Sequence, residues 1–126
     1  MWTWDQSAGV LYREGEVVSR GFSGAGRGKN NPSLQGVPGV GPIPRGRWRM
    51  MGVYNSKRVG PFTITLWRMG DTAFDDFDST TGRSAFRIHG DSIRAPGTAS
   101  RGCIILPRNI REMMWRSGDH DINVID

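Results

Sequence analysis

Cys103 and His89 are the side chains of this chain best suited to nucleophilic and acid–base chemistry. Cys103 is the only cysteine, so it cannot form a disulfide within the chain and serves either packing or thiol chemistry. The thiolate is the nucleophilic form of cysteine, and a nearby histidine can act as the base that generates it. Ser100 and Gly102 precede the sulfur and leave the backbone room to approach a substrate. These residue types predict acyl transfer through a thioester.

A structural interpretation of the same residues stands beside the chemical one. A buried cysteine can act as a small hydrophobe, and a histidine can be satisfied by a backbone hydrogen bond. The chemical interpretation requires amides aimed at a developing oxyanion, and the N–H groups of Gly102 and Cys103 are available for it. It also requires two neighbouring strands, one ending at His89 and one beginning at Cys103. The sequence leaves both interpretations open.

Short strands separated by turn signals must position these residues. The first three predicted strands form an antiparallel meander, because Ser-Ala-Gly and Glu-Gly turns separate them. Later segments alternate apolar and polar residues, as half-buried strands do. The predicted strands cover residues 2–5, 10–13, 16–22, 47–54, 62–68, 84–89, 103–106 and 121–125.

The other segments are predicted to be two loops and one helix. Residues 23–46 are rich in glycine and proline and lack apolar periodicity, which indicates an ordered, functional loop because long loops in compact domains are uncommon otherwise. Residues 71–83 are interpreted as an acidic and polar loop. A helix is predicted over residues 107–117, with proline near its start and glycine after its end. Its apolar face is expected to carry Ile110, Met113 and Met114.

Length and composition place the chain among mainly β proteins of the β-rich α+β type. A chain of 126 residues suits one domain with a single modest core, so we expect one domain over residues 1–126. The 18 glycines and seven prolines indicate many turns. No apolar stretch is long enough to span a bilayer. The N-terminus shows neither a basic start nor an apolar region, so no signal peptide is visible and synthesis in the cytoplasm is expected.

The positive charge is concentrated in the first half of the chain. The net charge is +5, and residues 1–60 hold nine basic and three acidic side chains, which gives +6. Residues 61–126 hold eight basic and nine acidic side chains, which gives −1. The excess indicates either solubility or a polyanionic partner. Nucleic acid, an anionic membrane face and the carboxylate-bearing bacterial cell wall are the candidate partners.

Two other kinds of site have weak support. The glycines of residues 24–28, with Lys29, do not have the spacing of a phosphate loop, and no helix is expected after them. His89, Cys103 and His120 are acceptable metal ligands, but no close pair of ligands anchors a site. We therefore expect no metal and no cofactor. His120 is interpreted as a turn residue.

The segment Ile88-His89-Gly90, followed by Ser100-Arg101-Gly102-Cys103, resembles the signature of the YkuD-type L,D-transpeptidases, cysteine enzymes of bacterial peptidoglycan. More of the chain is similar to one branch, the L,D-transpeptidase/carboxypeptidase effectors delivered by type VI secretion, which has phage and prophage relatives. That branch shares Phe22-Ser23-Gly24, Asn30-Asn31-Pro32 and the run Gly41-Pro42-Ile43-Pro44-Arg45-Gly46. The similarity covers most of residues 2–107.

The resemblance implies an L,D-transpeptidase-like β-sandwich with one short helix after the catalytic cysteine. It implies that Cys103 is the nucleophile and that His89 is its general base, oriented by a backbone carbonyl near Gly90 or Asp91. The amides of Gly102 and Cys103 are expected to form the oxyanion hole. The substrate implied is the peptidoglycan tetrapeptide stem, from which D-alanine is expelled. Water as acceptor then gives carboxypeptidase activity, and an amine gives transpeptidation.

Supporting roles are implied for residues around this pair. Ser100 is expected to hydrogen-bond within the site or to the stem. Arg87, Arg94 and Arg101 are expected to pair with stem carboxylates, because a guanidinium grips a carboxylate through two hydrogen bonds. Action in the periplasm or cell wall after delivery is expected, with an immunity protein as a partner and without nucleic acid.

A basic, non-catalytic module that binds cell wall or nucleic acid is the alternative function. Its stacking surfaces would be Trp2, Trp4, Trp48 and Trp67, and its arginines would provide the charge. Aromatic residues at strand spacing are more often part of a core. Release of D-alanine from peptidoglycan tetrapeptide fragments, compared between wild type and Cys103→Ala, separates the two functions.

Overall fold

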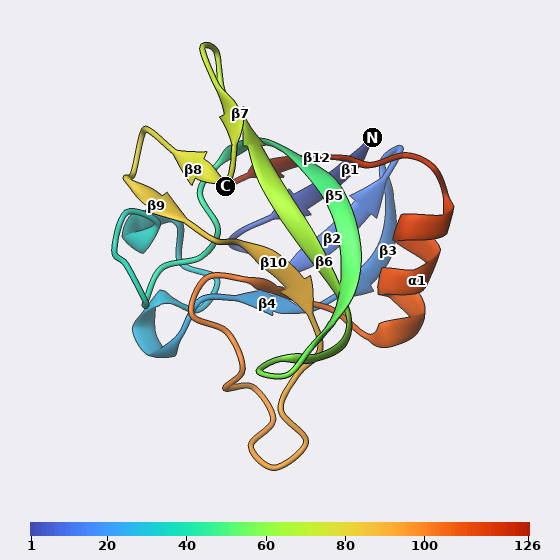
Figure 1. Cartoon of the computed structure of the whole chain (residues 1–126). Helices are drawn as coiled ribbons and strands as arrows, with labels where there is room; N and C mark the ends of the chain where they lie inside the picture. Colours follow the sequence, from blue (N-terminus) through green and yellow to red (C-terminus); the bar gives the residue numbers. More distant parts are fainter.

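The computed structural model describes residues 1–126 and contains many strands and one α-helix, α1 (Arg108–Arg116) (Figure 1). The mainly β prediction is confirmed. Two short 3-10 turns, η1 (Gly26–Gly28) and η2 (Pro32–Leu34), lie in the long glycine-rich segment. The strands are β1 (Trp2–Asp5), β2 (Val10–Arg13), β3 (Glu16–Arg20), β4 (Phe22–Ser23), β5 (Gly46–Ser56), β6 (Gly60–Met69), β7 (Phe74–Asp75), β8 (Phe77–Asp78), β9 (Arg83–Ser84), β10 (Arg87–His89), β11 (Ile104–Ile105) and β12 (Asp121–Ile125).

Ten strands form one mixed sheet in the order β3-β2-β1-β12-β5-β6-β10-β11-β4, with β7 paired to β6, while β8 and β9 form a separate pair. The predicted meander of β1, β2 and β3 is confirmed as antiparallel. The strands β3 and β4 lie at opposite ends of this order, yet only Gly21 separates them in the chain. The expected sandwich is therefore a single sheet that curves around its own core.

The core lies inside this curved sheet and consists of 15 buried hydrophobic residues. Trp2, Trp4 and Trp48 are fully buried in it. Along β5, Trp48 and Met50 are buried while Arg47 and Arg49 are exposed, because side chains alternate between the two faces of a strand. Burial of these three large aromatic side chains contributes strongly to stability, because each removes a large apolar area from water.

Two sequence predictions are wrong in detail. The segment expected to be a polar loop contains β7, β8 and β9, whose two-residue lengths are too short to show a period of two. The helix is confirmed, but Met113 is exposed rather than on the apolar face. Arg111 takes that place and is buried beside Met114, three residues further along the same face.

The strands that carry the candidate residues are neighbours. β10 and β11 pair in parallel, with Ile88 opposite Ile104 and His89 opposite Ile105. Residues 90–103 make the connection between them, part of which forms the orange loop at the bottom of Figure 1. The adjacency of these two strands, which the chemical interpretation requires, is present in the structure. The nine-residue α1 is too short to cross a bilayer, and the structure contains no helix that could.

Candidate active site

His89 is the last residue of β10 and is 2% exposed. Its Nδ1 lies 2.8 Å from the carbonyl oxygen of Gly90, one of the two positions where an orienting carbonyl was expected. When Nδ1 donates to this oxygen, Nε2 keeps the lone pair that a general base needs. Burial lowers the pKa of His89, and the nearby charge of Arg111 lowers it further. The environment therefore favours the uncharged imidazole.

A hollow of about 1040 Å³, here called the His89 hollow, opens beside this imidazole. Arg20, Gly21 and Phe22 line one side and the turn between β5 and β6 lines another. Asp91 is its only acidic residue. The cationic residues that line it are Arg20, Lys57, Arg58, Arg94, Arg108 and Arg111. The hollow is thus suited to a ligand that carries carboxylates.

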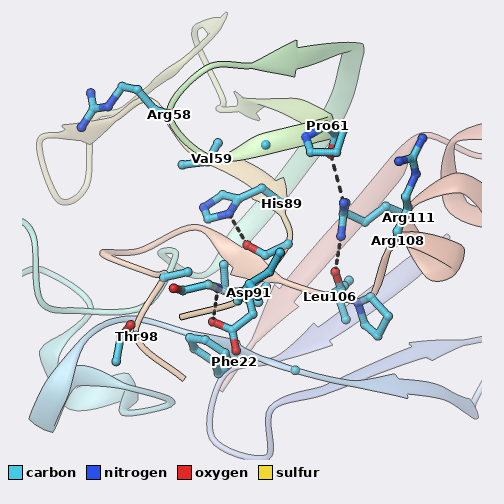
Figure 2. A pocket seen from close by; sticks show the side chains of 18 of the residues that line it. Phe22, Arg58, Val59, Pro61, His89, Asp91, Thr98, Leu106, Arg108 and Arg111 are labelled. Atoms are coloured by element: carbon cyan, nitrogen blue, oxygen red, sulfur yellow. Dashed lines mark hydrogen bonds between the residues drawn. The ribbon is translucent and has the colours of Figure 1, made fainter. Parts of the chain in front are cut away.

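Arg111 braces the wall of the His89 hollow and was not predicted as a site residue. Figure 2 shows its guanidinium between Pro61 and Leu106, and it donates to both of their carbonyl oxygens. Its Nε donates to the carbonyl oxygen of Phe62 at 2.9 Å. The arginine therefore ties α1 to the start of β6. The spacing of three residues between Arg111 and the buried Met114 is the sequence signal that could have identified it.

Asp91 and Gly90 support the geometry of this hollow through the backbone. The Asp91 carboxylate accepts hydrogen bonds from the amides of Ser92 and Gly97, both at 2.7 Å. These bonds stabilise the turn of the connection between β10 and β11. Gly90 lies against Arg111, where an added Cβ would approach Nη1 to 3.2 Å.

Cys103 precedes β11 and is partly exposed. The register of β10 and β11 pairs Ile88 with Ile104 and His89 with Ile105, so Cys103 lies just before the paired residues of β11. No hydrogen bond joins Cys103 to His89, and the two side chains line different hollows. The predicted pair therefore lies at the end of β10 and just before β11, without direct contact.

The Cys103 hollow, of about 390 Å³, is lined by Cys103, Arg83, Phe86, Arg101 and Gly102 among others. Burial raises the pKa of the Cys103 thiol. The backbone N–H of Arg87 and the guanidinium groups of Arg87 and Arg83 act in the opposite direction. The sulfur therefore lies in a buried but electropositive environment.

Ser100 holds the turn that presents the sulfur, in agreement with the expected role within the site. Its Oγ donates to the carbonyl of Cys103 at 2.6 Å and accepts from the amides of Gly102, at 3.1 Å, and Gly24, at 2.8 Å. Ser23 Oγ donates to the carbonyl of Gly102 at 2.6 Å and accepts from the amide of Ile43 at 2.8 Å. The two serines therefore fasten the long glycine-rich segment to the cysteine turn.

The two amides expected to form an oxyanion hole differ in availability. The Gly102 amide is already engaged by Ser100. The Cys103 amide donates to no other group in the structure. Cys103 therefore offers the free donor at this turn.

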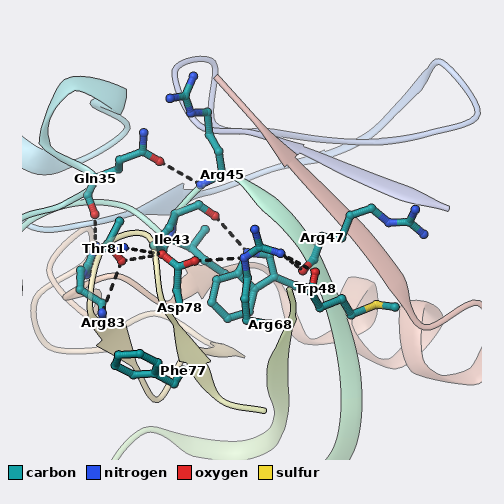
Figure 3. Close-up of polar contacts among 12 residues, drawn as sticks. Gln35, Ile43, Arg45, Arg47, Trp48, Arg68, Phe77, Asp78, Thr81 and Arg83 are labelled. Carbon is teal, nitrogen blue, oxygen red and sulfur yellow. Dashed lines mark hydrogen bonds and ion pairs between the residues drawn. The ribbon is translucent and has the colours of Figure 1, made fainter. Parts of the chain in front are cut away.

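Arg83 is a second buried arginine that sequence reasoning missed. It is 7% exposed and donates to the carbonyls of Gln35 and Pro42 through Nη1, at 2.7 and 2.8 Å, and to those of Gly41 and Arg101 through Nη2, at 3.1 and 3.2 Å. Figure 3 shows it beside Thr81 and near Gln35. No local pattern predicts this role, because most of its partners are about forty residues away in the chain.

The three arginines predicted to bind stem carboxylates lie in different places. Arg94 is exposed at the His89 hollow. Arg101 is exposed at the Cys103 hollow, where its carbonyl oxygen binds Arg83. Arg87 donates from Nε to the Tyr54 hydroxyl at 3.1 Å. The structure therefore does not gather them around one ligand position.

His120 and the tryptophans have structural positions. The His120 ring stacks on Trp115 with centroids 4.1 Å apart, and its Nε2 contacts the Trp115 carbonyl oxygen at 3.1 Å. Trp2, Trp4 and Trp48 are fully buried and cannot stack on a ligand. The alternative binding module thereby loses three of its four stacking surfaces.

Comparison with known proteins identifies one family. The family model described as the Tlde1 domain matches residues 18–124. This range includes the glycine-rich segment, His89 and Cys103. Neither a curated protein nor a solved structure matches the chain.

Proposed function

Because the chain belongs to the Tlde1 domain family, the type VI secretion L,D-transpeptidase effectors, we propose that it is a cysteine L,D-carboxypeptidase and L,D-transpeptidase of peptidoglycan tetrapeptide stems. The observation that carries this proposal is the parallel pairing of β10 with β11, which brings the strand that ends at His89 beside the strand that follows Cys103. The Gly90 carbonyl that orients the imidazole supports it.

The proposed reaction begins with proton transfer from the Cys103 thiol to Nε2 of His89. The thiolate attacks the carbonyl carbon of the third stem residue, and the Cys103 amide donates to the developing oxyanion. The bond from this carbon to the nitrogen of D-alanine then breaks, and the departing amine takes the proton from His89. A thioester on Cys103 is left. Water or an acceptor amine attacks it, giving hydrolysis or transfer and restoring the thiol.

The reaction requires Nε2 and the sulfur to approach each other when the stem binds. Hydrogen bonds between catalytic groups are often long in a free enzyme and tighten in the complex. The connection of residues 90–103 contributes to both hollows, with Ala99 in one and Arg101 in the other. Its Ile93 is 98% exposed. We propose that this connection moves when the stem binds and thereby joins the two hollows.

The charge of the His89 hollow supports an acidic stem as substrate. Arg20, Lys57, Arg58 and Arg94 line it and make no ion pair with any residue of the chain. Free cations at a concave surface attract carboxylates and raise the association rate. The stem offers several carboxylates, and its terminal D-alanine is one of them.

Family membership also supports delivery to the periplasm of a target cell. Type VI effectors that attack the cell wall require an immunity protein in the producing cell, and we include such a partner in the proposal.

The test is release of D-alanine from purified tetrapeptide fragments, followed by mass spectrometry. Wild-type protein is expected to release D-alanine and to form a thioester adduct on Cys103, visible in the intact protein mass. Cys103→Ala and His89→Gln are expected to abolish release. Arg116→Met is the matched control, since this exposed helix residue lies outside both hollows. Equal release by Cys103→Ala would overturn the proposal, and binding without release would favour the non-catalytic module.

A further inference from the structure

Arg83 is a buried cation without a carboxylate partner. All four of its hydrogen-bond acceptors are backbone carbonyls. The nearby Asp78 is engaged elsewhere: it accepts from Arg68 Nε at 3.1 Å and from the Thr81 hydroxyl at 2.6 Å (Figure 3). Buried charges in proteins are normally paired, because removing a charge from water is costly. Carbonyl oxygens accept hydrogen bonds from Nη1 and Nη2 of Arg83, but no carboxylate balances its charge.

The guanidinium of Arg83 lies against the peptide that precedes Cys103. Its Nη2 donates a hydrogen bond to the carbonyl oxygen of Arg101 at 3.2 Å. A Cβ at Gly102 would lie only 2.5 Å from Nη2, so this close approach requires glycine. Arg83 and Cys103 then line the same hollow. The buried cation is thus placed next to the one group of the site that becomes an anion.

The other charged groups around the sulfur have the same sign. Arg87 faces it from β10 and Arg101 from the connection, and no Asp or Glu lines the Cys103 hollow. The glycine-rich segment contributes only Pro38 and Gly39 to the hollow. The remaining titratable group of the site, His89, lines the other hollow.

We propose that Arg83 is a positioning residue for Cys103, whose buried guanidinium serves as the resident counter-cation of the thiolate in place of a protonated His89. This inference rests on the proposed function of Cys103 as a nucleophile. In the free protein the thiol exchanges its proton with solvent, and Arg83 balances the charge of the thiolate that forms. Once the stem is bound, Nε2 of His89 takes the proton of the thiol and later gives it to the departing amine, as in the reaction above. His89 then acts on the leaving group and the attacking water or amine, while Arg83 determines how much thiolate is present.

Two pKa directions agree with this division. Burial lowers the pKa of Arg83, while Cys103 and Asp78 act to raise it. The pKa of His89 is lowered, which disfavours an imidazolium in the free protein.

The test is the pH dependence of alkylation of Cys103 by iodoacetamide. The protein has one cysteine, so the rate reports the thiolate at this position alone. Arg83→Met is expected to raise the midpoint of the profile by about one pH unit, which is roughly a tenfold loss of rate on its acidic side. His89→Gln and the control Arg116→Met are expected to keep the wild-type midpoint. Circular dichroism establishes that each variant is folded.

A second pair of variants keeps the test decisive if Arg83→Met does not fold. Arg83→Lys retains the positive charge but cannot reach four carbonyl oxygens. Its alkylation midpoint is expected to lie closer to the wild-type midpoint than that of any folded variant without a charge at residue 83. Arg87→Met removes a neighbouring charge and is expected to raise the midpoint. A wild-type midpoint in Arg83→Met, or a rise in His89→Gln as large as in Arg83→Met, would overturn the inference.

The outcome is separate from that of the proposed function. Alkylation needs no peptidoglycan, so a protein that releases no D-alanine but shows the Arg83 dependence would refute only the proposed reaction. Release of D-alanine with an alkylation midpoint indifferent to Arg83 would refute only the inference.

Discussion

Replacement of Ser100 by alanine tests the hydrogen bonds that hold the cysteine turn. Ser100 is 1% exposed, and its hydroxyl makes three hydrogen bonds, to the carbonyl of Cys103 and the amides of Gly24 and Gly102. A hydrogen bond contributes about 1 kcal/mol net, and a buried group left without a partner costs about 1–3 kcal/mol. We therefore expect Ser100→Ala to lower the free energy of unfolding by about 3 kcal/mol.

The assay is equilibrium unfolding in urea, where this loss shifts the midpoint by about 1–2 M for a typical slope. Ser92→Ala is the matched control from the same connection, because its hydroxyl accepts one exposed hydrogen bond, from the Ala95 amide at 3.0 Å. Its expected cost is about 0.5 kcal/mol. Faster amide exchange at Gly102 should accompany the loss in Ser100→Ala. Equal unfolding free energies in the two variants would refute the assigned role of Ser100.

Three further predictions concern other parts of the site. Arg111→Met removes a positive charge that lowers the pKa of His89, so NMR titration of the imidazole should show a higher pKa in this variant. The control Arg116→Met should leave the pKa of His89 unshifted, and an unchanged pKa in Arg111→Met would contradict the prediction. Because the pKa of His89 is lowered in the folded protein, the unfolded chain binds a proton at this residue more readily than the folded one. The contribution of neutral His89 to the free energy of unfolding is therefore complete above about pH 6.5 and is lost as the pH falls. His89→Gln should flatten the pH dependence of the free energy of unfolding in urea below that pH. A pH dependence parallel to that of wild type would contradict the prediction that neutral His89 stabilises the folded state. Gly102→Ala places a Cβ 2.5 Å from a guanidinium nitrogen, at a residue whose φ is +143°. It should lower the free energy of unfolding in urea by about 2–3 kcal/mol, against about 1 kcal/mol for Gly82→Ala, whose Cβ would lie in open space. Equal decreases in the two variants would contradict the close contact.

The sequence was most informative where its signals are local. The last strand has the predicted bounds, because residues 121–125 alternate cleanly between faces. The helix follows from proline near its start and Gly118 after its end, where φ is +77°. The chemical interpretation required the strand that ends at His89 to lie beside the one near Cys103, and the structure shows that pairing.

Features that depend on distant partners were beyond such reasoning. Arg83 belongs to a segment interpreted as loop, and its role depends on carbonyls contributed by residues 35–42 and by Arg101. The division of the site into two hollows likewise depends on how the connection of residues 90–103 folds back. Residue types alone carry no information on either arrangement.

The position of β12 has a consequence for the order in which the protein is made. β12 lies between β1 and β5, pairing with β1 in parallel and with β5 in an antiparallel register. The earliest strand of the sheet therefore has no neighbour on that side until residues 121–125 have been synthesised. Pairing over such sequence separation is slow compared with local folding. His89 and Cys103 therefore leave the ribosome before the strand that joins β1 to β5 is available.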